Sequence, residues 1–239
     1  MDQIKILGIE SSTSVCSVAI SCGEQVVVEY TLELGRHHSE RLQPMIERAL
    51  QEADLELCDL DSVAVAAGPG SFTGLRIGMG LAKGLCRGAD LKFVMISTLK
   101  SMALSAGAEG MSVCPMLDAR REEVYAGVYD IVEGLPVLKK PDRADSIKNW
   151  VQDLPRPVLL VGDGAYAYRD VIVDTLGPAA HFINASLGRP SAGAVALLGG
   201  LRSKQGDVDD VEVAEPFYLR RTQAERVREE RLKAAGQEA

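Results

Sequence analysis

The stretch from Gly68 to Gly74, Gly-Pro-Gly-Ser-Phe-Thr-Gly, has residue types that can bind an anion. It follows a short apolar run at residues 63–67, predicted to be a strand, and precedes a small-residue segment predicted to be a helix. A glycine-rich turn at a helix N-terminus presents backbone N–H groups to a phosphate, and Ser71 and Thr73 add hydroxyls that can cap the helix. The alternative is a tight turn whose glycines only let strand and helix pack closely. The stretch matches neither the Walker loop nor the dinucleotide-binding fingerprint, so both interpretations stay open.

Two more places in the chain have residues suited to the same chemistry. Glu10 ends a predicted strand at residues 4–10, and the hydroxyl residues that follow it offer a place for a metal–phosphate pair. A second apolar strand, at residues 158–161, leads into another glycine turn. Glu10 is equally consistent with a solvated residue at a strand end. The candidate nucleotide- or phosphate-binding residues are Glu10, Ser11, Ser12, Gly68, Gly70, Ser71, Thr73, Gly162 and Gly164.

Other chemistry is poorly supported by the sequence. His37 and His38 are adjacent, so they cannot lie on one helix face as a metal pair would need, and the third histidine is His181. The five cysteines are odd in number and have no Cys-x-x-Cys spacing, which predicts buried reduced thiols rather than zinc ligands or disulfides. Neither a Gly-x-Ser-x-Gly elbow nor a His-Glu-x-x-His motif supports a peptidase. We therefore expect no metal site.

The composition limits the function classes. The 239 residues suffice for one large domain or two small lobes, and 46% hydrophobic with 25% charged residues is ordinary for a globular protein. The net charge of −8, without a basic block in the body of the chain, argues against autonomous binding to nucleic acid. Residues 2–8 lead straight into a strand, and no apolar run is long enough to span a membrane. We expect a cytoplasmic protein without a membrane partner.

The elements that position these residues alternate between strands and helices. Strands at 4–10, 15–21 and 25–31 predict an opening β-meander. Ser39 is the expected N-cap of a helix that runs to about residue 53. In the helix after the first glycine turn, glycines form two rows, Gly74 with Gly78 and Gly80 with Gly84 and Gly88. Each glycine costs a helix about 1 kcal/mol, which implies close approach of another backbone, either in the same chain or, as we favour, in a second chain.

The second half repeats this order of elements. After a strand at 91–97 and a helix at 98–106, residues 107–110 mark a boundary, and a strand–turn–strand unit surrounds Asp118-Ala119-Arg120-Arg121. Residues 133–157 are mixed and polar, with one short helix near 146–153. We expect lobes at residues 1–106 and 107–212, with a C-terminal helix at 213–239 that joins the first lobe. The predicted fold is α/β and internally duplicated, with a cleft between the lobes.

Five blocks carry a family resemblance over nearly the whole chain. They read ILGIESSTSVCSVAI, HHSERLQPMIERAL, AAGPGSFTGLRIGMGLAKGL, MLDARREEVYAGVYD and EPFYLRR. The chain closely resembles the bacterial TsaB (YeaZ) family of the actin/Hsp70/sugar-kinase superfamily, which implies duplicated RNase H-like lobes. One departure is that many members have Asp-Thr where this chain has Glu10-Ser11-Ser12, so the resemblance neither supports nor excludes phosphate binding there.

The resemblance implies a non-catalytic, activating subunit that helps to install threonylcarbamoyl on the tRNA adenosine beside the anticodon. It implies a homodimer, a TsaD-like catalytic partner, a TsaE-like ATPase, and tRNA contacted through the complex. The paralogue's metal-binding histidine pair corresponds to Thr98 and Met102, and its late aspartate to Ser191, which are unsuitable ligands. No cofactor is required by this chain itself, although ATP or ADP can sit at the interface of the complex.

The resemblance also implies a shared surface for self-association and for TsaD. Its expected residues are Leu42, Met45, Ile46, Ala49, Gly74, Ile77, Gly78, Leu81 and Ala82. One surface with two uses predicts that the homodimer and the heterodimer exclude each other. The alternative function is a free-standing small-molecule kinase or ATPase, for which Glu10, Asp118 and Asp163 are candidate carboxylates by position only.

Overall fold

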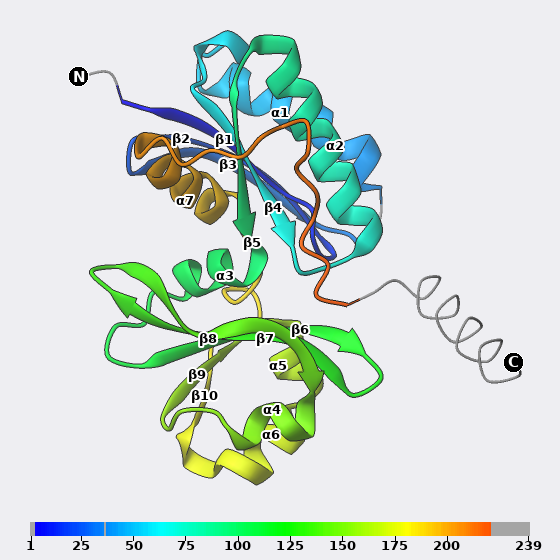
Figure 1. Cartoon of the computed structure of the whole chain (residues 1–239), viewed down its shortest axis with the longest axis vertical. Coiled ribbons are helices and arrows are strands. Elements are labelled where there is room, and N and C mark those ends of the chain that lie inside the picture. The colour runs from blue at the N-terminus through cyan, green and yellow to red at the C-terminus, as the bar shows by residue number, and fades with distance from the viewer. Residues whose placement is uncertain (1–2, 36, 221–239) are drawn as a thin grey trace, which may run out of the picture.

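Two five-stranded mixed sheets, one in each lobe, organise the molecule (Figure 1). The computed structural model describes residues 3–35 and 37–220. The first sheet has the order β3-β2-β1-β4-β5, with β1 (Lys5–Glu10), β2 (Val15–Cys22), β3 (Gln25–Glu33), β4 (Ser62–Gly68) and β5 (Lys92–Ser97). The second has the order β10-β9-β6-β7-β8, with β6 (Ser112–Arg120), β7 (Glu123–Val132), β8 (Leu135–Ser146), β9 (Val158–Val161) and β10 (Ala180–Phe182).

The two sheets have the same topology. In each, an antiparallel meander of three strands is extended on the side of its first strand by two parallel strands. β1 therefore corresponds to β6, and β4 corresponds to β9. Each parallel strand is reached through a helical crossover, as parallel pairing requires. The repeated topology confirms the predicted duplicated α/β fold.

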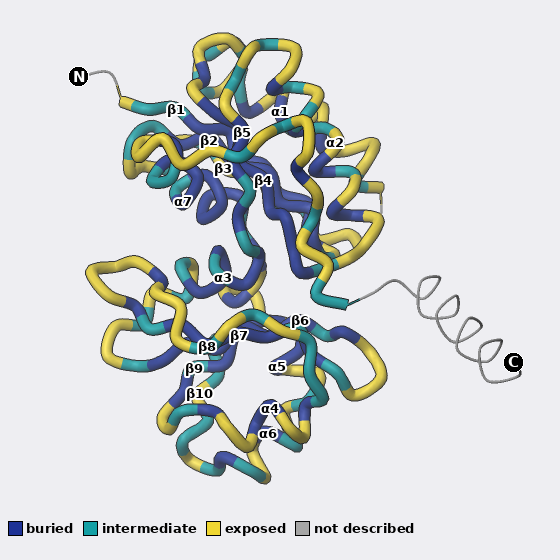
Figure 2. Tube along the Cα trace, viewed as in Figure 1, coloured by how far each residue is buried: buried dark blue, intermediate teal, exposed yellow. Residues whose placement is uncertain are grey.

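Helices cover both faces of the first sheet. α1 (His38–Glu52) and α2 (Phe72–Ala89) lie on one face, and α7 (Ala192–Lys204) lies on the other. Side chains alternate between the two faces along β4, where Val63 and Val65 join the core beneath α1 and α2 while Ala64 and Ala66 join the core beneath α7. Figure 2 shows α7 and the central strands β1, β2 and β4 almost wholly buried, whereas the edge strand β3 is half-buried to exposed.

Close approach of backbones explains the small residues of α7. A Cβ on Gly8 of β1 would lie 2.2 Å from the carbonyl oxygen of Ala192, and a Cβ on Gly199 would lie 2.3 Å from the Cβ of Ala64. We expected residues 192–204 in the second lobe, but α7 packs against β1, β2 and β4 of the first sheet. The first lobe is therefore built from two separate parts of the chain.

The junction between the lobes is formed by α3 (Thr98–Ala106), which we expected within the first lobe. Its buried residues Leu99, Met102 and Ala103 pack with Val113 and Leu117 of the second sheet, and the helix also contacts α7. α3 connects β5 of the first sheet to β6 of the second, so it lies between the lobes and packs against both.

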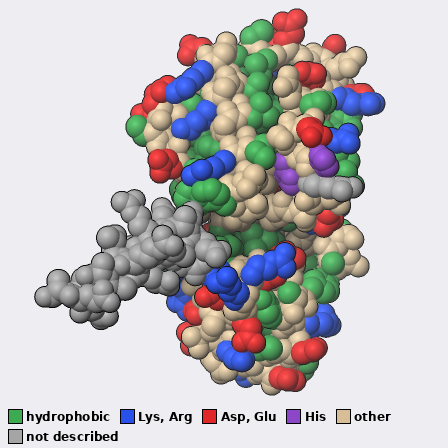
Figure 3. Space-filling model, turned by 90° about the vertical axis from the view of Figure 1, so that its right-hand side faces the viewer, with side chains coloured by type: hydrophobic (Ala, Val, Ile, Leu, Met, Phe, Trp, Pro, Cys, Tyr) green, Lys and Arg blue, Asp and Glu red, His purple; other side chains and the backbone are tan. Residues whose placement is uncertain are grey.

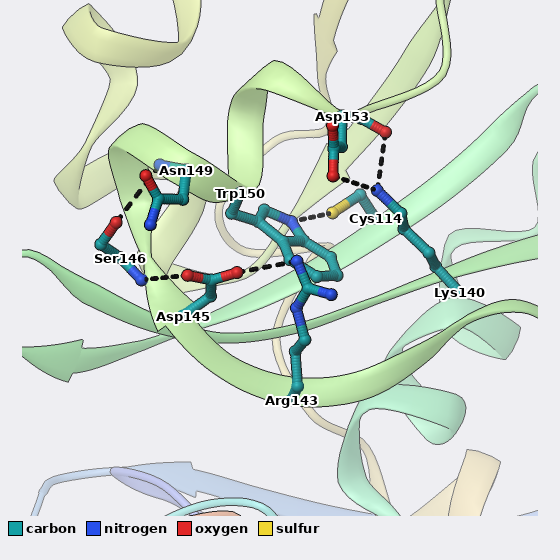
Figure 4. Close-up of polar contacts among 8 residues, drawn as sticks. All are labelled: Cys114, Lys140, Arg143, Asp145, Ser146, Asn149, Trp150 and Asp153. Atoms are coloured by element: carbon teal, nitrogen blue, oxygen red, sulfur yellow. Dashed lines mark hydrogen bonds and ion pairs between the residues drawn. The ribbon is translucent and has the colours of Figure 1, made fainter.

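The second lobe packs α4 (Ile147–Gln152), α5 (Asp163–Ala167) and α6 (Arg169–Leu176) against its sheet. Trp150 of α4 is fully buried, and its Nε1–H donates to Sγ of Cys114 over 3.3 Å (Figure 4). Arg143 and Lys140 of β8 lie over the indole ring, 4.8 and 5.4 Å from its centroid. Burial raises the pKa of the Cys114 thiol to about 12, so this thiol is an inert core group.

Several expectations about individual elements need correction. α1 begins at His38, and its N-cap is His37 with φ +68° and no side-chain cap, so Ser39 lies inside the helix. Residues 135–146 form the edge strand β8, which the sequence did not predict. No helix begins within residues 213–220, and residues 221–239 lie outside the described part of the chain. Across residues 3–35 and 37–220, no helix has the length and apolarity needed to cross a bilayer.

Candidate functional site

A cavity of about 690 Å³ lies between the two lobes, at the N-terminus of α2. Figure 3 shows the hollow, with histidine side chains on the upper lobe and Lys or Arg side chains on the lower lobe near its edges. The first lobe contributes Ser12, Thr13, Ser14, Gly35, His37, His38, Ser39, Gly70, Ser71, Thr73, Gly74 and Ile77. The second lobe contributes Leu117, Asp118, Ala119, Arg120, Tyr125 and Asp163.

The N-terminus of α2 forms the upper wall. Ser71 is the N-cap, and its side-chain oxygen accepts from the Gly74 N–H over 3.3 Å. The Ser71 N–H donates to the carbonyl oxygen of Ser12 over 2.6 Å, which ties the helix start to the β1–β2 turn. A Cβ on Gly70 or Gly74 would lie 2.1 Å from a backbone oxygen of that turn. These two glycines are therefore needed for packing, while Ser71 and Thr73 face the cavity.

Glu10 lies behind this wall rather than in the cavity. It is fully buried, and Oε1 accepts hydrogen bonds from both the N–H and the hydroxyl of Ser12, each over 2.6 Å. Within the described residues Oε2 has no hydrogen-bond partner. Burial raises the pKa of Glu10 to about 7, although the Ser12 hydrogen bonds act in the opposite direction. Glu10 does not line the cavity, so it cannot serve there as a base or a metal ligand.

The lower wall is the β6–β7 turn together with the start of α5. Asp163 Oδ1 accepts from the Asp118 N–H over 3.1 Å, and Asp118 Oδ1 accepts from the Arg120 N–H and the Tyr168 hydroxyl over 2.8 and 2.9 Å. Loss of water around the carboxylate raises the pKa of Asp163. Arg120 pairs with Asp118 over 3.2 Å but remains largely exposed. The wall thus combines two carboxylates with one guanidinium.

The turn that carries Arg120 has an unusual backbone. Arg120, Arg121 and Glu122 have φ values of +66°, +57° and +59°, and none of them is glycine. Left-handed conformations cost such residues about 1–2 kcal/mol each. This cost is one reason to regard the turn as functional.

The structure brings together only part of the predicted phosphate-binding set. Ser12, Gly70, Ser71 and Thr73 line the main cavity. Gly162 lines a smaller adjoining cavity of about 190 Å³ that shares Thr13, Ser14, Leu117 and Asp163 with the first.

The other predicted positions serve packing. Ser11 is buried, and its hydroxyl donates to the Gly74 carbonyl oxygen over 2.9 Å. Added Cβ atoms on Gly68, Gly162 and Gly164 would meet neighbouring backbone within 3 Å. The second glycine turn therefore packs closely against β6.

Several residues that line the cavity were not among the predicted site residues. His37 and His38 were considered only as metal ligands, and Arg120 only as part of a family block. The sequence does contain one signal for them. Arg120 and Arg121 come at the end of a predicted strand, and in a two-lobed fold a charged turn at a sheet end can face the cleft between the lobes.

The three positions that match the paralogue's metal ligands lie outside the cavity. Among the residues that the structure describes, no three His, Cys, Asp or Glu side chains converge on one metal position.

Those three positions have other roles in this fold. Thr98 and Met102 are fully buried on α3, and Met102 belongs to an apolar cluster. Ser191 caps α7, where its side-chain oxygen accepts from the Ala194 N–H over 3.3 Å and its hydroxyl donates to Glu29 over 2.8 Å. All three side chains are therefore committed to packing or to helix capping.

The residues expected at a partner surface are mostly inside the chain. Leu42, Ile46, Ala49, Gly74, Gly78 and Ala82 are buried in the first lobe's own core. A Cβ on Gly78 would lie 2.3 Å from the Ser11 hydroxyl oxygen, so this glycine row faces the same chain. Met45, Ile77 and Leu81 are half-buried. Gly80, Gly84 and Gly88 form the open row, where an added Cβ meets nothing within 4 Å.

Comparisons with known proteins agree with this architecture. The profile of the TsaD family, described as tRNA N6-adenosine threonylcarbamoyltransferase, matches residues 32–227. The chain is 33% identical to the tRNA threonylcarbamoyladenosine biosynthesis protein TsaB of Bacillus subtilis, over 92% of this chain and 96% of that one. The solved structure of YeaZ from Pseudomonas aeruginosa is 29% identical, covers 90% of this chain and 100% of its own, and has a TM-score of 0.78.

A more distant likeness concerns the fold alone. The ROK hexokinase of Thermus thermophilus is 13% identical, covers 85% of this chain and 100% of its own, and has a TM-score of 0.50. The architecture is therefore that of the actin/Hsp70/sugar-kinase fold. The near full-length match to a TsaB protein is far more specific, and it coincides with the duplicated lobes and the glycine turn described above. This chain belongs to the TsaB (YeaZ) family.

Proposed function

We propose that this chain is a structural and activating subunit in the biosynthesis of threonylcarbamoyladenosine on tRNA, and that it does not itself catalyse the transfer. The observation that carries the proposal is the 33% identity to a protein named for that biosynthesis, over 92% of the chain. We expect the chain to act in the cytoplasm and to reach tRNA through its partners.

The side chains at the paralogue's metal positions support a non-catalytic role. Thr98 and Met102 offer a hydroxyl and a thioether inside an apolar core, and neither suits a hard or borderline catalytic metal. The Ser191 hydroxyl is held by Glu29. The alternative of a free-standing kinase or ATPase needs a base and a metal-holding carboxylate in the cleft. Glu10 is enclosed behind the wall, and Asp118 and Asp163 are engaged with their own turn.

The partners in this proposal are a second copy of the chain, a TsaD-like catalytic subunit and a TsaE-like ATPase. The outer face of α1 and α2 is the surface we assign to the first two. Its open row of Gly80, Gly84 and Gly88 allows another backbone to approach closely, and Met45 and Leu81 add half-buried apolar area. This assignment replaces the buried row that the sequence suggested.

A matched pair of variants tests this surface. Gly84→Gln places a long side chain on the open row, whereas Asp174→Gln places the same side chain on the exposed side of α6 in the second lobe. Gel filtration of each variant, alone and with TsaD, should show loss of both assemblies for Gly84→Gln only. An intact dimer of this chain that binds TsaD through the same helices would contradict the mutual exclusion of the two assemblies.

An adenine nucleotide, ATP or ADP, fits the cavity in part. The hydroxyls of Ser71 and Thr73 at the α2 N-terminus and the Arg120 guanidinium are suited to phosphate oxygens, whereas Asp118 and Asp163 would need a cation between themselves and a phosphate. We propose that any nucleotide binds here within the complex and is not required by the chain alone. Calorimetric titration with Mg-ADP, for the chain alone and with TsaD, measures this, and Thr73→Ala should weaken binding.

The decisive experiment is a reconstitution of tRNA modification. Purified TsaD, TsaE, tRNA, ATP and threonylcarbamoyl-adenylate are held constant, and the chain is added or omitted. We expect modification only with the chain present, and no turnover of ATP or tRNA by the chain alone. Turnover by the chain alone would overturn the proposal and support the enzyme alternative.

A further inference from the structure

The segment that follows α7, residues 207–220, runs along the first lobe and is called here the C-terminal strap. The Asp209 N–H donates to the carbonyl oxygen of Phe93 over 2.8 Å, and Glu212 forms an ion pair with Arg87 of α2. The Phe217 N–H donates to the Ala67 carbonyl oxygen over 2.7 Å, at the end of β4. The strap is therefore attached to the first lobe as far as Phe217.

The strap then contacts the first turns of α2. The Tyr218 ring lies 5.2 Å from the Phe72 ring between centroids, and the Tyr218 hydroxyl accepts from Nε of Arg76 over 3.1 Å. The Arg76 guanidinium lies 3.9 Å from the Phe72 centroid. These contacts hold the strap beside Ser71 and Thr73, which form the upper wall of the cavity.

Two residues further on, the strap reaches the opposite wall. Arg220 Nη1 donates to the carbonyl oxygen of Ala119 over 2.9 Å and pairs with Oε2 of Glu123 over 3.0 Å. Only 18% of the Arg220 side chain is exposed, so this ion pair is partly shielded from water and firmer than one on an open surface. Ala119 lies at the end of β6, beside the β6–β7 turn, and lines the cavity.

The lobes are also joined at a second place, beside α3. The chain crosses between the sheets through α3 and through residues 183–191. Beside α3, Asp142 of β8 accepts from the hydroxyls of Ser97 and Tyr129 over 2.7 and 2.5 Å. In Figure 1 the strap ends on the right of the gap between the lobes, whereas α3 lies on its left. The two attachments are thus separated across the gap.

We propose that the C-terminal strap is a clasp that sets the width of the cavity, with Arg220 as the positioning residue that holds the second lobe against α2. A hinge at one side and a clasp at the other is the arrangement by which two rigid lobes open and close. It also gives a role to the EPFYLR and DARR blocks, because Arg220 of the first contacts Ala119 of the second. Loss of the Arg220 contacts frees the second lobe to rotate about the hinge and widens the cavity.

Distance measurement between spin labels tests the clasp on the full chain. Labels are placed on Glu47→Cys in α1 and Asn149→Cys in α4, both exposed, with Cys22→Ser and Cys58→Ser removing the accessible native thiols. Asn149 lies near the β6–β7 turn, because the adjoining α4 residue Ile147 donates its N–H to the Glu122 carbonyl oxygen. Arg220→Ala should shift the distance distribution to longer values and broaden it.

Two further variants show whether any shift in distance comes from the Arg220–Glu123 ion pair. Glu123→Gln removes the charged partner without touching the strap, and it should shift the distribution in the same direction by less. Arg121→Ala, on the same turn, is the matched control and should leave the distribution unchanged. Circular dichroism and melting temperature establish that each variant is folded. Distributions of Arg220→Ala and Glu123→Gln that superimpose on the parent's would overturn the proposal.

Discussion

Two helix N-termini in the first lobe have the same local design and opposite surroundings. Ser71 caps α2 and Ser191 caps α7, each by accepting a backbone N–H three residues later. At α7, the Glu29 carboxylate of β3 adds hydrogen bonds from the Ser191 hydroxyl and the Gly193 N–H over 2.8 and 3.2 Å. At α2, the first turn opens on the cavity. One N-terminus is thus satisfied by the chain's own anion, and the other faces the cavity.

The difference is made by where the first lobe places its two carboxylates, Glu29 and Glu10. A carboxylate near a helix N-terminus interacts favourably with the helix dipole, and Glu29 provides this at α7. Behind α2, Glu10 is turned away into the core, where it is bound by Ser12. The same lobe thus closes one helix start with a carboxylate and leaves the other open to the cavity. Four experiments test that contrast, in order from the largest expected effect to the smallest.

Gly74→Ala should be the most destructive change at the α2 N-terminus. The new Cβ would lie 2.1 Å from the Ser11 carbonyl oxygen, and backbone cannot move aside as a side chain can. We expect a loss of about 3 kcal/mol or more in the free energy of unfolding, measured in urea. The matched change Gly84→Ala, on the open row of the same helix, should gain up to about 1 kcal/mol. Equal effects at both sites would contradict the docking of α2 described here.

Glu10→Gln should change how stability depends on pH. Because the folded pKa, about 7, exceeds the ordinary value of 4.5, the native state holds a proton that the unfolded state releases. Stability from this group is present below pH 4.5 and is lost as the pH rises to about 7, by about 3 kcal/mol in total. Urea unfolding between pH 4.5 and 8 should show this loss in the parent and a smaller one in Glu10→Gln. Parallel curves would mean that Glu10 is ionised without cost.

Glu29→Gln should weaken α7 without affecting α2. The variant keeps an acceptor for the Gly193 N–H but loses the charge near the helix N-terminus, which is worth about 0.3–1 kcal/mol. Hydrogen exchange of the α7 amides, compared with those of α2, measures where the loss occurs. Glu24→Gln, an exposed change in the β2–β3 turn, is the control. Faster exchange in both helices would mean that Glu29 acts through the sheet rather than at α7.

The two caps themselves give the smallest contrast. Ser71→Ala should cost about 1 kcal/mol, as loss of an N-cap does. Ser191→Ala should cost less, because Glu29 still accepts from the Gly193 N–H. Chemical denaturation of the two single variants measures the difference. In a Glu29→Gln background the cost of Ser191→Ala should rise, and its failure to do so would show that the two acceptors act independently.

Much of the fold follows from sequence pattern. Three apolar runs separated by short turns within residues 4–31 predict the meander, and the repeated order of elements predicts the duplication. The edge strand β8 was not predicted, because its charged residues Lys139, Lys140 and Arg143 lie on a surface and the strand has no continuous apolar face. α7 was placed in the wrong half for a related reason: a helix of alanine and glycine is buried nearly all round, so its pattern does not indicate which sheet it covers.

The site was predicted less well than the fold. Helical spacing separates the row of Gly74 and Gly78 from the row of Gly80, Gly84 and Gly88, but it does not tell which row faces the protein's own core. Glu10 was a reasonable phosphate-site carboxylate by position, and only the structure places it behind Ser12. The lower wall of the cavity is formed by residues such as Asp118, Arg120 and Asp163. They lie opposite α2 only because of how the two lobes are placed relative to each other. Such long-range placement leaves no mark in local spacing.

The return of the chain to the first lobe through α7 has a consequence for biosynthesis. Ribosomes synthesise the first sheet completely by residue 97, yet the helix that covers one of its faces ends at residue 204. At about 5–20 residues per second, the side chains of Ile6, Ala64 and Val94 wait roughly 5–20 s for that cover. During this interval the second lobe can complete its own core, while the first presents an apolar face to the nascent-chain environment. Chaperone dependence of this protein should therefore originate in its first lobe, although that lobe is the first to be made.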